Sequence, residues 1–246
     1  MTTILTVRQL SKSYSGVQAL EDVDVDVQSG EVLGLVGPNG SGKTTLFNCV
    51  TGFTRASSGT IKWQGRETTR LATDQVARMG IVRTFQQKMV FPRPTVGENM
   101  EMAWQNRGNG GGGQAFASPG ELLEFLGLTS MAGTPAADIP FGSARKLGLG
   151  LALAARPTLL LLDEPAAGLN QDESQDLATL VGTIKDLGIT VWVIEHDMSL
   201  VMSACQRVIV LHAGRTIAEG RPAEIAKDPE VITVFLGEKF ARDQSA

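Results

Sequence analysis

The fold is decided by the stretch Val32 Leu33 Gly34 Leu35 Val36 Gly37 Pro38 Asn39 Gly40 Ser41 Gly42 Lys43 Thr44 Thr45. It opens with an apolar run of the length expected for a buried parallel strand. The rest matches G-x-x-x-x-G-K-[ST], a pattern typical of loops that bind phosphate. The glycines let the backbone curl so that several N–H groups point to one place, and the helix expected to begin near Lys43 adds its positive end. We therefore predict a polyphosphate site, with the Thr44 hydroxyl placed to hold Mg²⁺; the alternative is a flexible glycine loop between strand and helix.

Composition indicates a globular chain without strong charge bias. The 246 residues, 42% hydrophobic and 20% charged, can bury a substantial core as one large domain or two small ones. A net charge of −4 and a pI near 5.3 give no overall excess of basic residues, so charge does not support binding to nucleic acid. The N-terminus has no apolar core preceded by positive charge, and no run of 18 apolar residues occurs, so we expect a chain that is neither secreted nor membrane-spanning. Cys49 and Cys205 lack metal-ligand spacing and are expected to be reduced, buried thiols in a cytosolic compartment.

The N-terminal part has the pattern of a small antiparallel sheet. Residues 4–8 and 23–27 are predicted to be edge strands, since Val23 to Val27 alternates apolar and acidic residues with a period of two. Tyr14 lies between them on a segment rich in Ser, Lys and Gly. Two interpretations of Tyr14 stay open: it covers the strand pair, or it stacks on a nucleotide base.

The middle of the chain differs in character. Residues 98–104 and 121–128 have helical spacing of apolar residues, and a glycine run at residues 108–113 separates them. No Lys followed by Ser or Thr comes after that run, so we interpret it as a connector rather than a second phosphate loop. The pattern predicts a mainly helical subdomain inserted between two parts of an α/β domain.

Two later strands are predicted to end at one edge of a parallel sheet. Residues 159–162 form a continuous run of leucines that delivers Asp163 and Glu164, and residues 190–194 lead into His196. Open parallel sheets bind ligands at this edge. Buried carboxylates there need a partner, and Mg²⁺-nucleotide fits, although a polar turn is the alternative. His196 is either a structural hydrogen-bonding residue or part of the site.

The order and spacing of these motifs resemble the ATPase subunits of ABC transporters from near Leu5 to about Gly237, and among them those of branched-chain amino-acid importers. The general resemblance is carried by the phosphate loop, Gln86 after Phe85, Ile139 Pro140 Phe141 Gly142 Ser143 before a helix, Leu159 to Glu164, and His196. The narrower one is carried by Arg83 Thr84 Phe85 Gln86, by Asp163 Glu164 Pro165 Ala166 Ala167 Gly168 Leu169 Asn170, and by Phe235 Leu236 Gly237 Glu238.

The resemblance implies an α/β P-loop NTPase fold with a mainly parallel core sheet, an antiparallel β edge subdomain and an inserted helical subdomain. A single ABC ATPase domain would span residues 1–240. Within it, 1–87 and 156–240 would form the nucleotide-binding core with its N-terminal β subdomain, and 88–155 the helical signature subdomain. Residues 241–246 would be a polar tail.

The resemblance also implies roles for individual residues in the hydrolysis of ATP with Mg²⁺. Lys43 would bind the β- and γ-phosphates, Thr44 and Gln86 would ligate the metal, and Asp163 would hold it, through water. Glu164 would polarise the attacking water, His196 would contact the γ-phosphate, and Tyr14 would stack on adenine. The remaining nucleotide contacts in the same subunit would come from Gly37, Pro38, Asn39, Gly40, Ser41, Gly42 and Thr45.

In this family the signature segment of one subunit completes the site of another, so Phe141, Gly142 and Ser143 would act in trans. The chain holds one such domain, and it would pair with a copy of itself or with a second ABC ATPase subunit. Two departures from the common Leu-Ser-Gly-Gly-Gln signature limit the comparison most: Pro140 replaces the serine, and Ser143, followed by Ala144, replaces the glutamine. Asn170 replaces the usual aspartate after the carboxylates. The expected consequence is a pair of sites that is competent in hydrolysis, either symmetric or asymmetric.

The leading interpretation is an energy-coupling ATPase subunit of an importer for branched-chain or other amino acids. It would lie in the cytoplasm, peripheral on the inner face of the membrane, bound to two permease subunits. A periplasmic or extracellular solute-binding protein would be an indirect partner, and nucleic acid is not expected. The alternative is a soluble ABC ATPase acting on ribosomes, nucleic acid or assembly machinery. A GTPase switch is disfavoured because no Asn-Lys-x-Asp segment follows.

Overall fold

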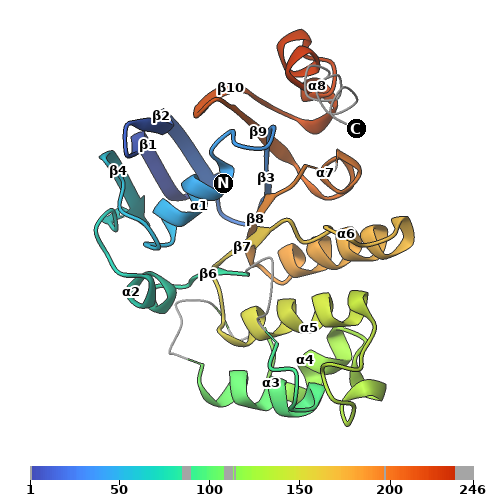
Figure 1. Cartoon of the computed structure of the whole chain (residues 1–246). Coiled ribbons are helices and arrows are strands. Elements are labelled where there is room, and N and C mark those ends of the chain that lie inside the picture. Colours follow the sequence, from blue (N-terminus) through green and yellow to red (C-terminus); the bar gives the residue numbers. More distant parts are fainter. Residues whose placement is uncertain (1, 85–89, 108–112, 114, 197, 236–246) are drawn as a thin grey trace.

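The computed structural model describes residues 2–84, 90–107, 113, 115–196 and 198–235. Within these ranges the chain forms a six-stranded sheet, a four-stranded sheet and a group of helices (Figure 1). The predicted α/β fold, with its mainly parallel core sheet, antiparallel β subdomain and helical insertion, is confirmed. No helix of the described part is long and apolar enough to cross a membrane.

The larger sheet has the strand order β10-β9-β3-β8-β7-β6. Its five strands from β9 to β6 are parallel, and only β10 pairs antiparallel, with β9. β3, which the phosphate loop follows, lies inside the sheet between β9 and β8. The strands are β3 (Val32–Val36), β6 (Ile81–Arg83), β7 (Leu159–Asp163), β8 (Thr190–Ile194), β9 (Arg207–His212) and β10 (Arg215–Gly220).

This sheet separates two hydrophobic cores, because alternate residues of each strand point to opposite faces. In β7, Leu160 and Leu162 enter the core under the long helices, whereas Leu159 and Leu161 enter the core shared with the antiparallel sheet. The same alternation places Asp163 on the face of Leu161. The continuous leucine run is thus explained by a strand that is buried on both sides.

The smaller sheet has the order β2-β1-β4-β5 and is antiparallel throughout. The alternation predicted for residues 23–27 is confirmed, with Val23, Val25 and Val27 buried. The prediction that residues 4–8 form an edge strand is wrong, because β4 pairs with the other side of β1. The strands are β1 (Thr3–Tyr14), β2 (Val17–Gln28), β4 (Ser58–Trp63) and β5 (Arg66–Glu67).

The helices flank the core sheet in two groups. The helix after the phosphate loop, α1, contributes Phe47 to the core on the antiparallel side, where its ring meets Trp192 edge-on with centroids 5.0 Å apart. The helices α6 and α7 bury Leu177 and Leu200 against the opposite face. The elements are α1 (Lys43–Val50), α2 (Thr73–Arg78), α6 (Gln171–Asp186), α7 (Met198–Ala204) and α8 (Pro222–Ile225).

The inserted helices pack as one group beside the sheet (Figure 1). Thr95 and Glu98 form a capping box that begins α3, and Ser118 caps α4. The predicted helix 121–128 ends early, at Phe125, because Gly127 adopts a left-handed conformation with φ 69°. The elements are α3 (Val96–Gln105), α4 (Pro119–Phe125), the short 3₁₀ helix η1 (Thr129–Met131) and α5 (Phe141–Ala154). The domain boundaries given above stay a prediction.

Candidate active site

The phosphate loop joins β3 to α1 and has a backbone that requires glycine. Gly37 and Gly42 have φ angles of 149° and 106°. A Cβ atom on Gly37 would overlap the carbonyl oxygen of Leu211, and one on Gly42 would lie 2.5 Å from the carbonyl oxygen of Ala19. The loop is therefore clamped between β9 and β2, with no room for side chains at these two positions.

Lys43 is the first residue of α1 and lies under the loop rather than in solvent. Its side chain is buried, and Nζ donates hydrogen bonds to the carbonyl oxygens of Gly37, at 2.6 Å, and Pro38, at 2.8 Å. The ammonium is thus fixed inside the curl of the loop. The buried Ser41 hydroxyl has no hydrogen-bond partner among the described residues, and no side chain caps the N-terminus of α1. The loop presents donors and positive charge, as an anion site requires.

Asp163 is held at the end of β7 by a buried ion pair with Arg83. Nη2 of Arg83 donates to Oδ2 of Asp163 at 2.5 Å, and both side chains are nearly inaccessible, at 5% and 4% exposure. Nη1 of Arg83 donates to Oδ1 of Asn48 on α1 at 2.6 Å, and the guanidinium lies 5.6 Å from the centre of the Phe47 ring. One arginine from β6 therefore ties the carboxylate to the helix that carries Lys43.

The second oxygen of Asp163, Oδ1, is buried and has no hydrogen-bond partner in the described part of the chain. Such an acceptor costs free energy unless something binds to it. An oxygen-seeking cation such as Mg²⁺, which takes one or two carboxylates together with phosphate oxygens, is a chemically suitable partner for this oxygen. The exposed Thr44 hydroxyl, on the first turn of α1, is a further oxygen of the kind that such a cation prefers.

Glu164 and His196 follow two neighbouring strands, as predicted, and approach each other. Oε1 of Glu164 lies 3.9 Å from Nδ1 of His196, too far for a hydrogen bond but close enough for electrostatic interaction. Their side chains are 23% and 47% exposed, so both can meet a ligand. Glu164 has a φ of 46°, a left-handed conformation that is unfavourable for a residue with a Cβ and is common at functional sites.

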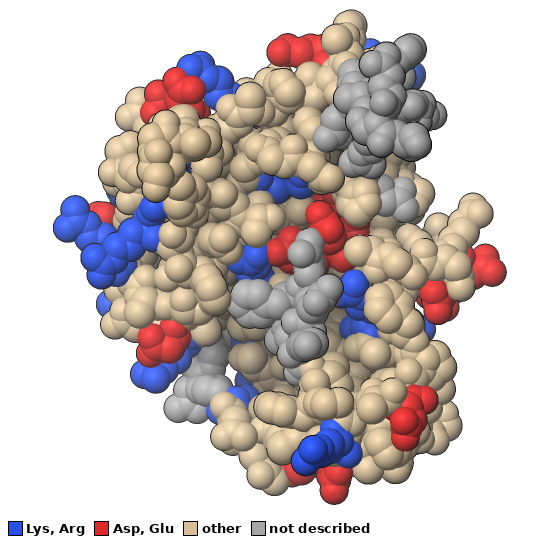
Figure 2. Space-filling view, viewed as in Figure 1, with Lys and Arg blue, Asp and Glu red and all other residues tan. Residues whose placement is uncertain are grey.

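Figure 2 shows acidic and basic side chains gathered at the middle of the face seen in Figure 1, over the ends of the central strands. Asp163 ends β7 and Glu164 follows it, while Lys43 begins α1 and Arg83 ends β6, so both signs of charge occur among these elements. This mixture of signs can bind a metal complex of a polyanion, which itself carries both signs.

Tyr14 ends β1 and lies across the hairpin turn from Val17. Its side chain is 43% exposed, and the Lys12 ammonium lies 4.6 Å from the ring centre. The interpretation that Tyr14 covers the strand pair as part of a core is therefore wrong. The same hairpin packs against Gly42 through Ala19, so the ring is on a strand pair that borders the phosphate loop.

Of the signature segment expected before a helix, Phe141, Gly142 and Ser143 form the first turn of α5, whereas Ile139 and Pro140 precede it. Phe141 is 54% exposed, and its ring packs against Gly168 in the segment after Glu164. Arg145 donates from Nη2 to the carbonyl oxygen of Ala167 at 3.1 Å. The signature turn is thus joined to the segment that follows Glu164 in its own subunit.

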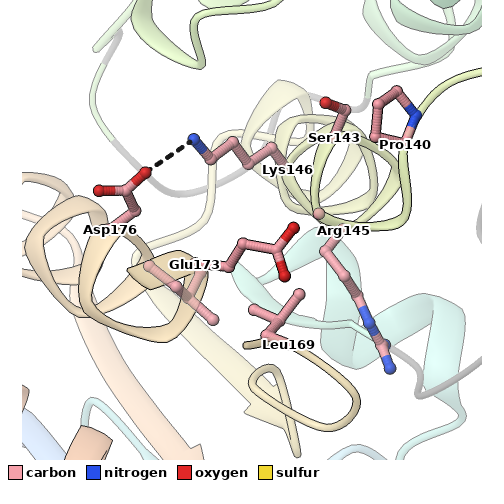
Figure 3. Close-up of a pocket in the computed structure, with 9 residues that line it drawn as sticks. Pro140, Ser143, Arg145, Lys146, Leu169, Glu173 and Asp176 are labelled. Atoms are coloured by element: carbon pink, nitrogen blue, oxygen red, sulfur yellow. Dashed lines mark ion pairs between the residues drawn. The ribbon is translucent and has the colours of Figure 1, made fainter. Parts of the chain in front are cut away.

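A pocket of about 110 Å³ lies between this turn and the start of α6 (Figure 3). The Glu173 side chain projects from α6 toward α5, and Oε1 lies 2.6 Å from where a Cβ atom on Gly142 would be. At the rim, Lys146 and Asp176 form an ion pair at 3.8 Å. Gly142 therefore has a carboxylate of its own subunit as its neighbour.

Gln86, predicted as a metal ligand, lies outside the described residues, as does Asp197. Sequence reasoning missed the roles of Arg83, Asn48 and Glu173. The sequence does contain a signal for Arg83, because this cationic residue follows a short apolar run and lies at the end of the strand next to the one that ends at Asp163. Asn48 and Glu173 carry no such local signal, because their partners come from distant parts of the chain.

Comparison with known proteins places this geometry in a family. The family model described as ABC transporter matches residues 20–167, which is more than half of the chain. The chain belongs to the ABC transporter ATP-binding family. It is an ATPase. A second family model, described as branched-chain amino acid ATP-binding cassette transporter, matches residues 215–241.

Relatives of this ABC ATPase cover nearly its whole length. It is 36% identical to the high-affinity branched-chain amino acid transport ATP-binding protein LivG of Escherichia coli strain K12 over 250 residues, 96% of this chain and 98% of the relative. BraF of Pseudomonas aeruginosa has the same identity and coverage. The lipopolysaccharide export system ATP-binding protein LptB of Escherichia coli is 34% identical over 96% of this chain and 98% of its own.

Among solved structures, the ADP conformation of MJ1267, an ATP-binding cassette of an ABC transporter, superposes with a TM-score of 0.88 at 29% identity. The similarity covers 96% of this chain and all of MJ1267, at 100%. The two-sheet architecture with its inserted helices is therefore that of ABC ATPase cassettes.

Proposed function

We propose that this chain is the ATP-hydrolysing, energy-coupling subunit of an importer for branched-chain or other amino acids. The observation that carries the proposal is the match of residues 215–241 to the branched-chain family model, outside the segment that ABC transporters in general share. The 36% identity to LivG and BraF over 96% of the chain also supports a function in branched-chain amino acid transport. LptB, at 34%, supplies the second candidate, a subunit of an export system.

Within this function the loop from Gly37 to Thr45 binds the phosphates, with Lys43 at the β- and γ-phosphates and Tyr14 against adenine. The buried hydroxyl of Ser41, the glycine cradle and the fixed ammonium support this assignment. Tyr14 is exposed enough to stack on a base.

Thr44, Asp163 and Gln86 hold Mg²⁺, which supplies positive charge for the phosphates during transfer. The buried Oδ1 of Asp163, which has no hydrogen-bond partner among the described residues, supports the role of Asp163 in holding the metal. Glu164 polarises and orients the attacking water, because a carboxylate can accept its proton or a strong hydrogen bond. His196, 3.9 Å from Glu164, contacts the γ-phosphate.

A second subunit completes the site with its copies of Phe141, Gly142 and Ser143, whose helix N-terminus donates to the γ-phosphate. In Figure 1, α5 lies apart from α1, which supports a role toward another subunit's nucleotide. Gly142→Asp alone would press a carboxylate against Glu173, only 2.6 Å from the new Cβ. The trans role is therefore tested with Gly142→Asp in a Glu173→Ala background, with Glu173→Ala alone as control; unchanged hydrolysis would exclude it.

The partner ATPase is a copy of this chain or a related subunit. Two permease subunits anchor the pair to the inner face of the membrane, and a solute-binding protein outside the cell delivers the amino acid. Nucleic acid is not a partner. ATP closes the pair, and hydrolysis reopens it.

Uptake of labelled leucine, isoleucine and valine tests the proposed function in cells that lack this gene. Uptake should fall on deletion, return with the wild-type chain and stay low with Glu164→Gln, which retains the fold and the ATP site. Uptake that survives deletion would contradict the import of branched-chain amino acids by this transporter. A loss of lipopolysaccharide export on deletion would favour the second candidate, and co-purification with ribosomes would favour a soluble ATPase.

A further inference from the structure

Glu195 is a carboxylate that is 0% exposed and stands directly after β8, on the opposite sheet face from Asp163. Burying a charged carboxylate is costly unless hydrogen bonds compensate for the lost water. An apolar side chain would serve if this position only needed to be packed, and Val193, two residues earlier on the same face, is such a side chain. The contacts of Glu195 explain what the charge does.

The two oxygens of Glu195 bind the two loops that carry Glu164 and His196. Oε1 accepts a hydrogen bond from the backbone N–H of Ala166 at 2.8 Å, two residues after Glu164. Oε2 accepts from the backbone N–H of His196 at 3.2 Å. One side chain therefore joins the turn after Glu164 to the segment that begins with His196.

A third contact makes this connection rigid. The backbone N–H of Glu164 donates to the carbonyl oxygen of Ile194 at 3.0 Å. The turn is thus fixed on both sides of Pro165, at Glu164 by the backbone of β8 and at Ala166 by Glu195. Glu164 adopts its disfavoured φ of 46° between these two attachments. Such a conformation persists only where the surrounding contacts impose it.

We propose that Glu195 is a positioning residue that fixes the Glu164 carboxylate and the His196 imidazole relative to each other. The inference rests on the proposed roles of Glu164 and His196, and it adds a residue to which neither the family motifs nor those roles assign a task. Glu195 acts through its two backbone acceptor contacts, so its removal lets the turn relax from the left-handed conformation. Glu164 would then point away from the water that it must orient, while the phosphate loop stays intact.

Three variants separate this role from simple packing. Glu195→Ala removes both acceptors. Glu195→Gln keeps the shape and one acceptor for Ala166, but turns an amide N–H₂ toward the N–H of His196. Val193→Ala is the matched control, since Val193 is equally buried on the same face of β8 and contacts neither loop through a hydrogen bond.

The measurements are the steady-state turnover of ATP by the assembled transporter and the affinity for ATP, at a temperature at which all variants are folded. Glu195→Ala should lower kcat on the order of 10- to 100-fold with less than about a 3-fold change in ATP affinity. The kcat of Glu195→Gln should lie between that of Glu195→Ala and that of the wild type. Val193→Ala should have a kcat within about 2-fold of the wild-type value. Adding Glu195→Ala to His196→Ala should reduce kcat by less than Glu195→Ala does alone.

The inference is overturned if Glu195→Ala loses no more kcat than Val193→Ala. If Glu195→Ala does not fold, a Glu195→Gln variant with wild-type kcat overturns it equally. Glu164→Gln is measured in parallel: if that variant keeps the turnover of the wild-type protein, the proposed role of Glu164 has failed. If it is inactive while Glu195 variants behave as Val193→Ala does, only this inference has failed.

Discussion

Replacing Arg83 by Met should destabilise the nucleotide-free protein strongly. The change keeps an unbranched side chain of similar length but removes both donors. Asp163, at 4% exposure, then keeps a buried charge without its cation, and Oδ1 of Asn48 loses its donor as well. Breaking a buried ion pair by removing one partner costs about 3–5 kcal/mol, because the remaining charge is left uncompensated. We expect a loss of about that size in the free energy of unfolding.

Unfolding by guanidinium chloride in the absence of nucleotide measures this loss of stability, and Arg78→Met is the matched control. Arg78 pairs with Asp74 at 3.4 Å, but the two side chains are 76% and 62% exposed, so that loss should be at most about 0.5 kcal/mol. Adding Asp163→Asn to Arg83→Met removes the buried charge and should recover stability, leaving a deficit of about 1–3 kcal/mol. A loss for Arg83→Met no larger than for Arg78→Met, or a double variant less stable than Arg83→Met, would show that the buried pair does not stabilise the fold in this way.

The remaining predictions concern the loop glycines and the thiols. Gly37→Ala should lower the melting temperature more than Gly40→Ala does, because the new Cβ would overlap the carbonyl oxygen of Leu211, whereas a Cβ on Gly40 would meet no atom of a non-adjacent residue within 4 Å. Equal shifts in thermal unfolding would be inconsistent with the clamped loop. Burial raises the pKa of the Cys49 thiol to about 11 and that of the Cys205 thiol to about 12, from an ordinary value of 9.0. Above pH 9 the unfolded state therefore loses thiol protons first, and the free energy of unfolding should fall by about 1.4 kcal/mol per pH unit for each thiol, a decline that the double Cys→Ala variant should lack.

Much of the fold followed from local patterns in the sequence. The apolar runs of β3, β7 and β8 predict buried parallel strands, and the residues after them lie at one sheet edge as expected. These features depend on alternation and spacing within a few residues, which the sequence displays directly. The phosphate loop is of the same kind, since its glycines are required by the backbone angles that the structure has.

The rest depended on contacts between distant segments. Arg83 meets Asp163 only because β6 pairs in register with β7, with Arg83 opposite Leu161. The interior place of β1 depends on β4, which returns to it after the phosphate loop and α1. Glu195 has no role that the sequence alone predicts, since its partner Ala166 belongs to the turn after another strand. Such pairings are set by tertiary packing, which local periodicity does not encode.

In the proposed site one set of residues binds ATP, while Glu164 activates water for its hydrolysis. ATP affinity and turnover measured together in Glu164→Gln separate these two roles, since the change removes the charge and keeps the shape. We expect ATP affinity to stay within about 3-fold while turnover falls on the order of 10²-fold or more. Turnover equal to that of the wild-type protein would contradict it.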